Sequence, residues 1–215
     1  MNKLLCALLL GMASLSAQAT TTLVNSSFET NNVGSGYLYA NWGVQADGWN
    51  FMDAAGGAGV SANGTGWAGQ ASDGNYFAFL QNGGLLKQTI NVESAADLAF
   101  SFDLAQRSAW NSGGAQTIAV TFDDLVLGTF TPYADIGWDT WKRYTVEASN
   151  VTAGEHVISF VGLNPNHAYD TAVFLDKVSL NVTPVPEPET YAMLLIGLGT
   201  MGCLKRRKQK PSATV

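Results

Sequence analysis

The region between residues 20 and 183 contains no cysteine, because Cys6 and Cys203 are the only two in the sequence. Their absence excludes a disulfide scaffold, a thiolate zinc site and a cysteine nucleophile from this region. Histidine is also scarce, with two residues in the chain and no pair at metalloprotease spacing. The Gly-x-Ser-x-Gly motif of serine hydrolases does not occur either. The sequence therefore favours a protein that is not an enzyme.

Positive charge is scarce in the same region, which holds fifteen acidic and five basic residues and so has a net charge of −10. Nucleic-acid binding needs clustered Lys and Arg side chains against phosphates, so this composition argues against it. The last eleven residues reverse the pattern and are basic, with Arg206 and Arg207 at the centre of the cluster. Basic residues directly after an apolar run are typical of a cytoplasmic topology signal.

The N-terminus has the three parts of a secretory signal peptide. Lys3 supplies the positive start, residues 4–10 form an apolar centre, and residues 17–19 are a small-x-small cleavage site. We expect cleavage after Ala19 and export of the mature protein, with an N-terminal core helix as the alternative. The predicted order is a signal peptide at 1–19, a β-sandwich at 20–183, a Pro-rich linker at 184–190, a short transmembrane sorting helix at 191–204 and a basic cytoplasmic tail at 205–215.

The C-terminal segment combines an extended linker with a short apolar run. Pro184, Pro186 and Pro188 favour an extended chain, because proline fixes φ and lacks an amide donor. Residues 191–204 are uncharged, and a helix of these fourteen residues covers about 21 Å, against about 30 Å for the hydrocarbon core of a bilayer. Such a run favours a transient stay in a membrane, with an ordinary short tail anchor as the alternative.

Pro186-Glu187-Pro188, the glycine-containing apolar run and the basic cluster with Arg206 and Arg207 resemble the PEP-CTERM sorting signal. Proteins with this tail look like substrates of exosortase, a membrane transpeptidase of Gram-negative bacteria that make exopolysaccharide. The resemblance implies export, a transient stay in the inner membrane, and release to the cell surface or the extracellular matrix. The tail is also known as an ice-binding-protein C-terminal domain, a label that says nothing about what the body binds.

Residues 20–183 alternate apolar and polar residues and show almost no helical periodicity. In residues 98–104 and 118–122 every second residue is apolar, which is typical of strands with one buried face. Further strands are expected at 22–28, 76–81, 86–92, 141–148, 156–161 and 172–182. Short strands separated by Gly- and Asn-rich turns predict an all-β fold, an antiparallel β-sandwich. Residues 53–74, with seven glycines, are expected to form a long surface loop, either a binding loop or a disordered insertion.

The landmarks LVNSSFE, ADGWNF, WKRYTVEA, AGEHVISF and FLDKVSL occur in an order that resembles the galactose-binding-like jelly roll of family 4 and family 22 carbohydrate-binding modules. The resemblance implies a structural calcium ion held by Glu29 and Asp176, with backbone carbonyls completing six to eight oxygens. Lys177 stands where these modules often have a second acidic residue. From the residues alone, Asp176 shares a strand face with apolar side chains and needs a partner, so an aspartate that caps backbone amides at a strand bend is the alternative.

Aromatic side chains in predicted loops offer flat faces on which a sugar ring can stack. The candidate ligand-binding residues are Arg107, Trp110, Tyr133, Trp138, His167 and Tyr169. Trp42 and Trp67 also lie in or beside predicted loops, whereas Trp49 and Trp141 are expected to be structural. Packing in the core or in a loop is the alternative for each aromatic residue, and an ion pair is the alternative for Arg107.

These features predict an exported, exosortase-sorted protein whose β-sandwich binds polysaccharide without catalysis. A second hypothesis is a structural protein of the matrix or envelope that binds itself or other proteins, because a fold does not fix a function. A third is a small glycoside hydrolase, which would need two carboxylates facing each other across a cleft.

Overall fold

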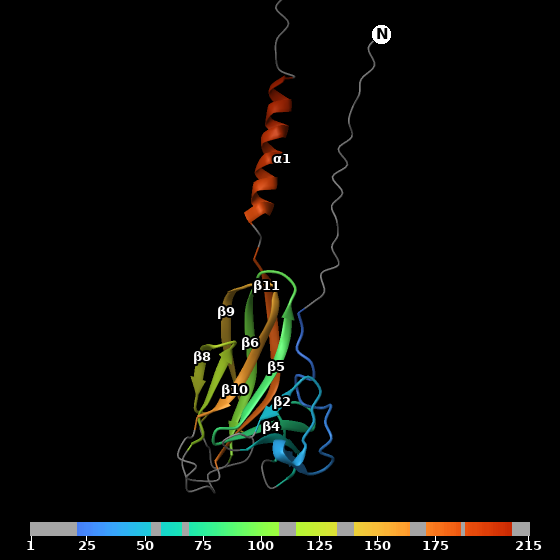
Figure 1. Cartoon of the computed structure of the whole chain (residues 1–215), viewed down its shortest axis with the longest axis vertical. Helices are drawn as coiled ribbons and strands as arrows, with labels where there is room; N and C mark the ends of the chain where they lie inside the picture. The colour runs from blue at the N-terminus through green and yellow to red at the C-terminus, as the bar shows by residue number, and fades with distance from the viewer. Residues whose placement is uncertain are drawn as a thin grey trace, which may run out of the picture.

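The computed structural model describes residues 21–52, 57–65, 69–107, 115–132, 140–163, 171–185 and 188–207. Within these residues two antiparallel sheets form a sandwich, and one α-helix follows it near the C-terminus (Figure 1). The predicted antiparallel β-sandwich with a short C-terminal helix is therefore confirmed.

The first sheet has six strands in the order β1-β3-β4-β11-β6-β9. Their bounds are β1 (Tyr37–Tyr39), β3 (Ala58–Ala62), β4 (Tyr76–Gln81), β6 (Ala96–Gln106), β9 (Lys142–Val151) and β11 (Ala172–Pro184). The second sheet has five strands in the order β2-β5-β10-β7-β8. Their bounds are β2 (Asn50–Met52), β5 (Leu85–Val92), β7 (Ile118–Phe122), β8 (Leu125–Phe130) and β10 (Gly154–Gly162). A short 3₁₀ helix η1 (Ala40–Trp42) follows β1, and helix α1 spans Pro188–Arg207.

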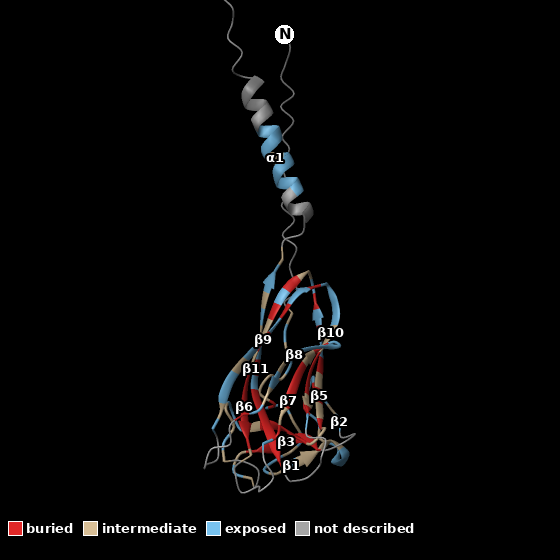
Figure 2. Ribbon diagram, turned by 90° about the vertical axis from the view of Figure 1, so that its left-hand side faces the viewer, coloured by how far each residue is buried: buried red, intermediate tan, exposed pale blue. Residues whose placement is uncertain are grey.

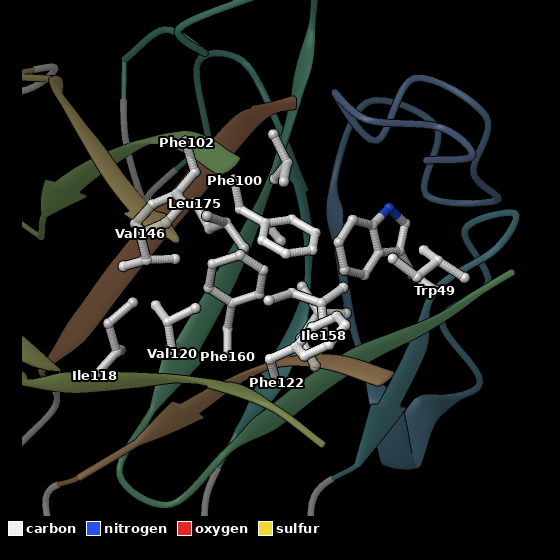
Figure 3. Close-up of a cluster of buried hydrophobic side chains, with 14 of the residues drawn as sticks. Trp49, Phe100, Phe102, Ile118, Val120, Phe122, Val146, Ile158, Phe160 and Leu175 are labelled. Carbon is white, nitrogen blue, oxygen red and sulfur yellow. The ribbon is translucent and has the colours of Figure 1, made fainter. Parts of the chain in front are cut away.

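The main hydrophobic core lies between the two sheets. The alternating apolar residues of β6 and β7 all point into it and are buried, as the sequence predicts (Figure 3). The rings of Phe102 and Phe160 meet edge to face there, with centroids 5.2 Å apart. Each buried side chain of this size contributes about 1.5–3 kcal/mol when it is removed from water.

A second, smaller core covers the outer face of the six-stranded sheet. Its buried members are Phe77, Phe79, Ala105, Ala172 and Phe174, and Tyr39, Ala71 and Trp141 pack against them. The strand β4 is therefore buried on both faces, which a one-face alternation does not predict. The indole of Trp141 donates to the carbonyl of Gln70 at 3.0 Å, and the buried Trp49 donates to the carbonyl of Asn25 at 3.0 Å. The predicted structural roles of both tryptophans are confirmed.

The expectation of one long surface loop over residues 53–74 is wrong in its middle. Residues 58–62 form the strand β3, which pairs with β1 and β4 and is buried along its whole length. The sequence AGVSA is not recognisable as a strand, because its small side chains do not form an alternating apolar pattern. Smallness is required at Gly59, where an added Cβ would overlap the carbonyl oxygen of Leu38 and the ring of Phe79.

The expected strand at residues 22–28 is also wrong, because this segment has no strand conformation. A side chain takes the place of a neighbouring strand. The amide of Gln88 accepts a hydrogen bond from the N–H of Val24 at 2.8 Å and donates to its carbonyl at 2.9 Å. Phe28, with an unusual positive φ of 59°, then enters the main core.

Helix α1 includes the expected sorting-helix residues 191–204 and extends beyond them at both ends. Figure 2 shows the sandwich with its buried strands and the helix outside it, where the described side chains are mostly exposed. Among the residues that the structure describes, no helix combines the length and apolar character needed to cross a membrane.

We predict that Gly59→Ala lowers the free energy of unfolding by about 1–3 kcal/mol, because the methyl group forces β1 away from β3 and β4. Chemical denaturation monitored by tryptophan fluorescence measures the change. Gly36→Ala is the matched control, because its Cβ would meet no atom closer than the carbonyl oxygen of Val33 at 4.0 Å. Equal stability of the two variants would contradict the close approach at Gly59.

Candidate ligand-binding pocket

The strand register defines two opposite ends of the sandwich. At one end β11 leaves its sheet at Pro184, opposite Ala96. At the other end Ala172, the first residue of β11, pairs with Gln81 at the end of β4. We call this second end the pocket end.

An open pocket with a volume of about 400 Å³ lies at the pocket end, which is within the usual range for small-ligand sites. It is formed by β1, η1, the approach to β3 and the turn between β4 and β5. The described residues that line it are Tyr37, Tyr39, Asn41, Trp42, Gly57, Gln81 and Asn82. This described lining combines aromatic rings and amides and has no charged side chain.

Three aromatic rings form one wall of the pocket. The ring of Tyr39 lies edge to face against Trp42, with centroids 4.8 Å apart, and Tyr37 lies 6.1 Å from Tyr39 and 6.2 Å from Trp42. Tyr39 is fixed from below by Phe79, a member of the outer core, at 4.9 Å. Trp42 remains 59% exposed and Tyr37 40% exposed. The cluster thus supports its own rings and still offers apolar ring surface to solvent.

Amide side chains face this wall. The hydroxyl of Tyr39 donates a 2.7 Å hydrogen bond to Oε1 of Gln81. Asn82 follows in the left-handed conformation, with φ 47°, which asparagine tolerates well in turns. Its Oδ1 is buried and has no hydrogen-bond partner among the described residues.

Two buried glutamines hold the turn at Asn82 in place. The side chain of Gln116 accepts a hydrogen bond from the N–H of Asn82 at 3.1 Å and donates to its carbonyl at 2.9 Å. The side chain of Gln106 in turn accepts a hydrogen bond from the N–H of Gln116 at 3.1 Å and donates to its carbonyl at 2.8 Å. The backbone at the pocket is therefore bonded through two amides to the end of β6, which lies two strands away from β4 in the six-stranded sheet.

The predicted calcium ligands Glu29 and Asp176 both hold the loop at residues 72–76 by hydrogen bonds. Oε1 of Glu29 accepts from the N–H groups of Asn75 at 2.8 Å and Tyr76 at 2.9 Å. Asp176 is fully buried and accepts from the N–H groups of Asp73 at 2.8 Å and Lys177 at 2.6 Å. Asp176 sits where the β6–β11 register shifts, so it shows the contacts of an aspartate that caps amides at a strand bend.

Burial raises the pKa of Asp176 from 3.8 to about 7, even though the N–H groups of Asp73, Lys177 and Ser72 favour its charged form; the nearby carboxylate of Asp73 raises the pKa further. N–H donors point at Oε1 of Glu29 and at both oxygens of Asp176, whereas a calcium ion is held by six to eight oxygen atoms. Among the described residues no group of three or more acidic, histidine or cysteine side chains is arranged to hold a metal. The calcium site therefore stays a prediction.

The other predicted site residues are only partly within the described chain. Arg107 directly follows β6 at the pocket end, where its N–H donates to the carbonyl of Ala172 at 2.9 Å, two strands away from Gln81. The predicted ligand residues Trp110, Tyr133, Trp138, His167 and Tyr169 lie outside the described residues, as do Ala19, Pro186 and Glu187. Pro188, Arg206 and Arg207 belong to helix α1, although their side chains are not described.

Most of the pocket is not predicted from the sequence. The sequence identifies Trp42 as a loop tryptophan, but it does not identify Tyr37, Tyr39, Gln81 and Asn82 as site residues. The segment GYLYANW carries the available signal, because two tyrosines at i and i+2 share one face of a strand and a tryptophan follows closely. A three-residue strand is too short for alternation to reveal it.

Residues 184–209 match the PEP-CTERM protein-sorting motif. The resemblance of the tail to this signal is thereby confirmed, and the motif implies export, exosortase processing and sorting to the surface. The match covers the tail and not the sandwich. No curated protein matches the chain.

Solved structures similar to this chain share its β-sandwich fold. Stig cyclase Fisc from Fischerella sp. TAU has a TM-score of 0.55 and 16% identity, with 78% of this chain and 99% of that chain covered. TmCBM61 in complex with β-1,4-galactotriose has a TM-score of 0.49 and 16% identity, with 76% and 99% covered. A family 35 carbohydrate binding module from Clostridium thermocellum has a TM-score of 0.45 and 17% identity, with 67% and 97% covered. At these identities the likeness concerns the fold alone.

We predict that the stability of the wild-type protein falls as the pH rises from about 4 to 7. The folded state holds the Asp176 proton up to about pH 7, whereas the unfolded chain releases it near its ordinary pKa of 3.8. The free energy of unfolding then decreases by at most about 1.4 kcal/mol per pH unit from this group. Denaturation curves between pH 4 and 8 measure the slope, which Asp176→Asn removes.

Asp124→Asn, which changes an exposed carboxylate, should keep the wild-type slope and serves as the control. Parallel pH profiles of the wild type and Asp176→Asn would contradict the prediction. A melting temperature that calcium raises in the wild type but not in Asp176→Asn would instead support the calcium site.

Proposed function

We propose that this protein is exported and that exosortase processes it after a transient stay in the inner membrane. The processed protein is placed at the cell surface or in the extracellular polysaccharide matrix, where its sandwich binds carbohydrate without catalysis. The observation that carries the binding proposal is the exposed Trp42 and Tyr37 beside the amides of the pocket. A sugar ring presents an apolar C–H face and a rim of hydroxyl groups. Aromatic rings suit the face, and amide groups suit the hydroxyls because they both donate and accept hydrogen bonds.

The shape of the sandwich supports the combination of sorting and binding. The chain runs from the last strand, β11, into the sorting motif at residues 184–209, and it does so at the end opposite the pocket. Processing of the tail therefore leaves the pocket end free to face the surrounding matrix.

The pocket gives less support to a glycoside hydrolase. Such an enzyme needs an acid and a second carboxylate on either side of the scissile bond. The described lining of the pocket contains neither a carboxylate nor a histidine. Binding without turnover is the chemistry that these side chains provide.

One observation favours the second candidate, a matrix protein that associates with itself. The strand β8 lies at the edge of the five-stranded sheet, and its residues Leu125 and Val126 are 64% and 57% exposed. The segment LVLGTF has none of the charges or prolines that usually protect an edge strand from pairing with another chain. Self-association through this edge is compatible with sugar binding at the pocket.

We predict that Trp42→Ala weakens binding to a retained polysaccharide about tenfold or more, because it removes the most exposed ring of the pocket. Affinity electrophoresis of the full chain in gels containing neutral or acidic polysaccharides, or the matrix polysaccharide of the producing cells, measures the change. Leu125→Ala removes an equally exposed apolar side chain from β8 and should leave the affinity unchanged.

No retention by any polysaccharide would refute carbohydrate binding and favour the self-associating protein. Retention that Trp42→Ala leaves unchanged would move the site from this pocket to another surface.

A further inference from the structure

Resting on the proposed function, we infer that the pocket selects an uncharged sugar and that Asn82 makes the selection by accepting a hydrogen bond from a sugar hydroxyl. The ligand class is a neutral hexose unit, and the excluded class is the corresponding uronic acid, in which the C6 hydroxymethyl group is replaced by a carboxylate. Asn82 is the specificity-determining residue, and Gln116 is the positioning residue behind it.

The charges around the pocket favour a neutral ligand. A uronate carboxylate only accepts hydrogen bonds and is bound well by Arg or Lys, neither of which occurs in the described lining. The net charge of −10 between residues 20 and 183 repels anions further. A hydroxyl group can donate to an amide oxygen, which a carboxylate at neutral pH cannot do.

The amide oxygen of Asn82 is the acceptor that lacks a donor. Its Oδ1 is buried beside the pocket without a partner among the described residues, a state that costs free energy until a donor reaches it. The last side-chain torsion of asparagine is broad, so rotation of the amide is the movement that brings Oδ1 within reach of a ligand in the pocket. A ligand hydroxyl that pairs with Oδ1 therefore relieves a deficit already present in the free protein.

The backbone that carries this oxygen is fixed before any ligand arrives. Gln116 binds both the N–H and the carbonyl of Asn82, as described above. On its other side the turn lies directly against Gly162 of β10, where an added Cβ would overlap the carbonyl oxygen of Asn82. A preformed turn of this kind positions a hydrogen-bond acceptor without an ordering cost on binding.

The test compares matched sugars that differ only at C6. Oligosaccharides of galactose, glucose and mannose are titrated against the full chain in mild detergent by calorimetry. Oligosaccharides of galacturonic, glucuronic and mannuronic acid are titrated in the same way. For any sugar that the protein binds, we expect the neutral oligosaccharide to bind at least about tenfold more tightly than the matching uronate.

Two variants separate the acceptor from the turn. Asn82→Gly removes the side chain while the positive φ remains easy to adopt, and Asn82→Asp keeps both an acceptor oxygen and a residue that tolerates this φ. Asn82→Gly should weaken neutral-sugar binding about fivefold, the effect of one hydrogen bond, and Asn82→Asp should stay within about twofold of the wild type. Asn150→Gly is the matched control, because Asn150 has the same backbone conformation, with φ 55°, at the far end of β9.

The outcomes distinguish this inference from the proposed function. Binding that Trp42→Ala weakens but that favours uronates would overturn the inference and leave carbohydrate binding at the pocket intact. Equal affinities of Asn82→Gly and Asn82→Asp would overturn the role of the acceptor oxygen. No binding of any sugar would overturn the proposed function and the inference together.

Discussion

Burial of Phe79 on the outer face of the six-stranded sheet is the constraint on which the pocket depends. Alternate residues of β4 enter two different cores, so its outer face needs a cover that the second sheet cannot provide. That cover consists of Tyr39, Ala71 and Trp141. Tyr39 in turn supports Trp42 and bonds to Gln81. The exposed aromatic wall of the pocket is thus the outermost layer of side chains that pack over Phe79. A loss of packing at Phe79 would reach the pocket directly.

Polar side chains give the irregular segments the bonds that strands receive from their neighbours. Gln88 pairs with the main chain of Val24, and Gln116 pairs with that of Asn82, each through one donor and one acceptor. Asp176 and Glu29 accept hydrogen bonds from the N–H groups of the loop at residues 72–76. A primary amide has the same donor and acceptor as a peptide group, so it can stand in for a strand edge. These segments gain order in this way without regular secondary structure.

The sequence predicts the parts of the fold that alternate over several residues, and it fails where tertiary packing decides. β6 and β7 are recognisable because their inward residues are large. β3 is not, because its close contacts select small residues that resemble a loop. Residues 22–28 have the composition of a strand, yet a single glutamine side chain replaces the partner strand. Asp176 is correctly identified as a carboxylate that needs partners, but the periodicity cannot tell amide donors from a cation.

The same limit applies to the candidate site. The aromatic loop residues chosen from the sequence lie mostly outside the described chain. The described pocket instead brings together β1, η1 and the β4–β5 turn, and its lining residues Tyr37 and Asn82 are 45 residues apart in the sequence. No local pattern links Tyr39 to Gln81; only the pairing of β1 with β3, and of β3 with β4, brings them together. The sorting motif, in contrast, is continuous in sequence and is recognised from its order alone.

The position of β11 in the sheet has a consequence for the timing of folding during export. β11 is the last strand of the chain but lies in the interior of the six-stranded sheet, between β4 and β6, and its bulge holds the N-terminal segment through a bond from Val178 to the carbonyl of Ser26. An exported chain emerges with its N-terminus first, so this sheet stays divided in two until residue 184 has crossed. Completion of such long-range pairing is slow compared with local structure. The sorting motif at residues 184–209 follows immediately, so the two halves of the sheet can be joined only when the residues next to this motif are available.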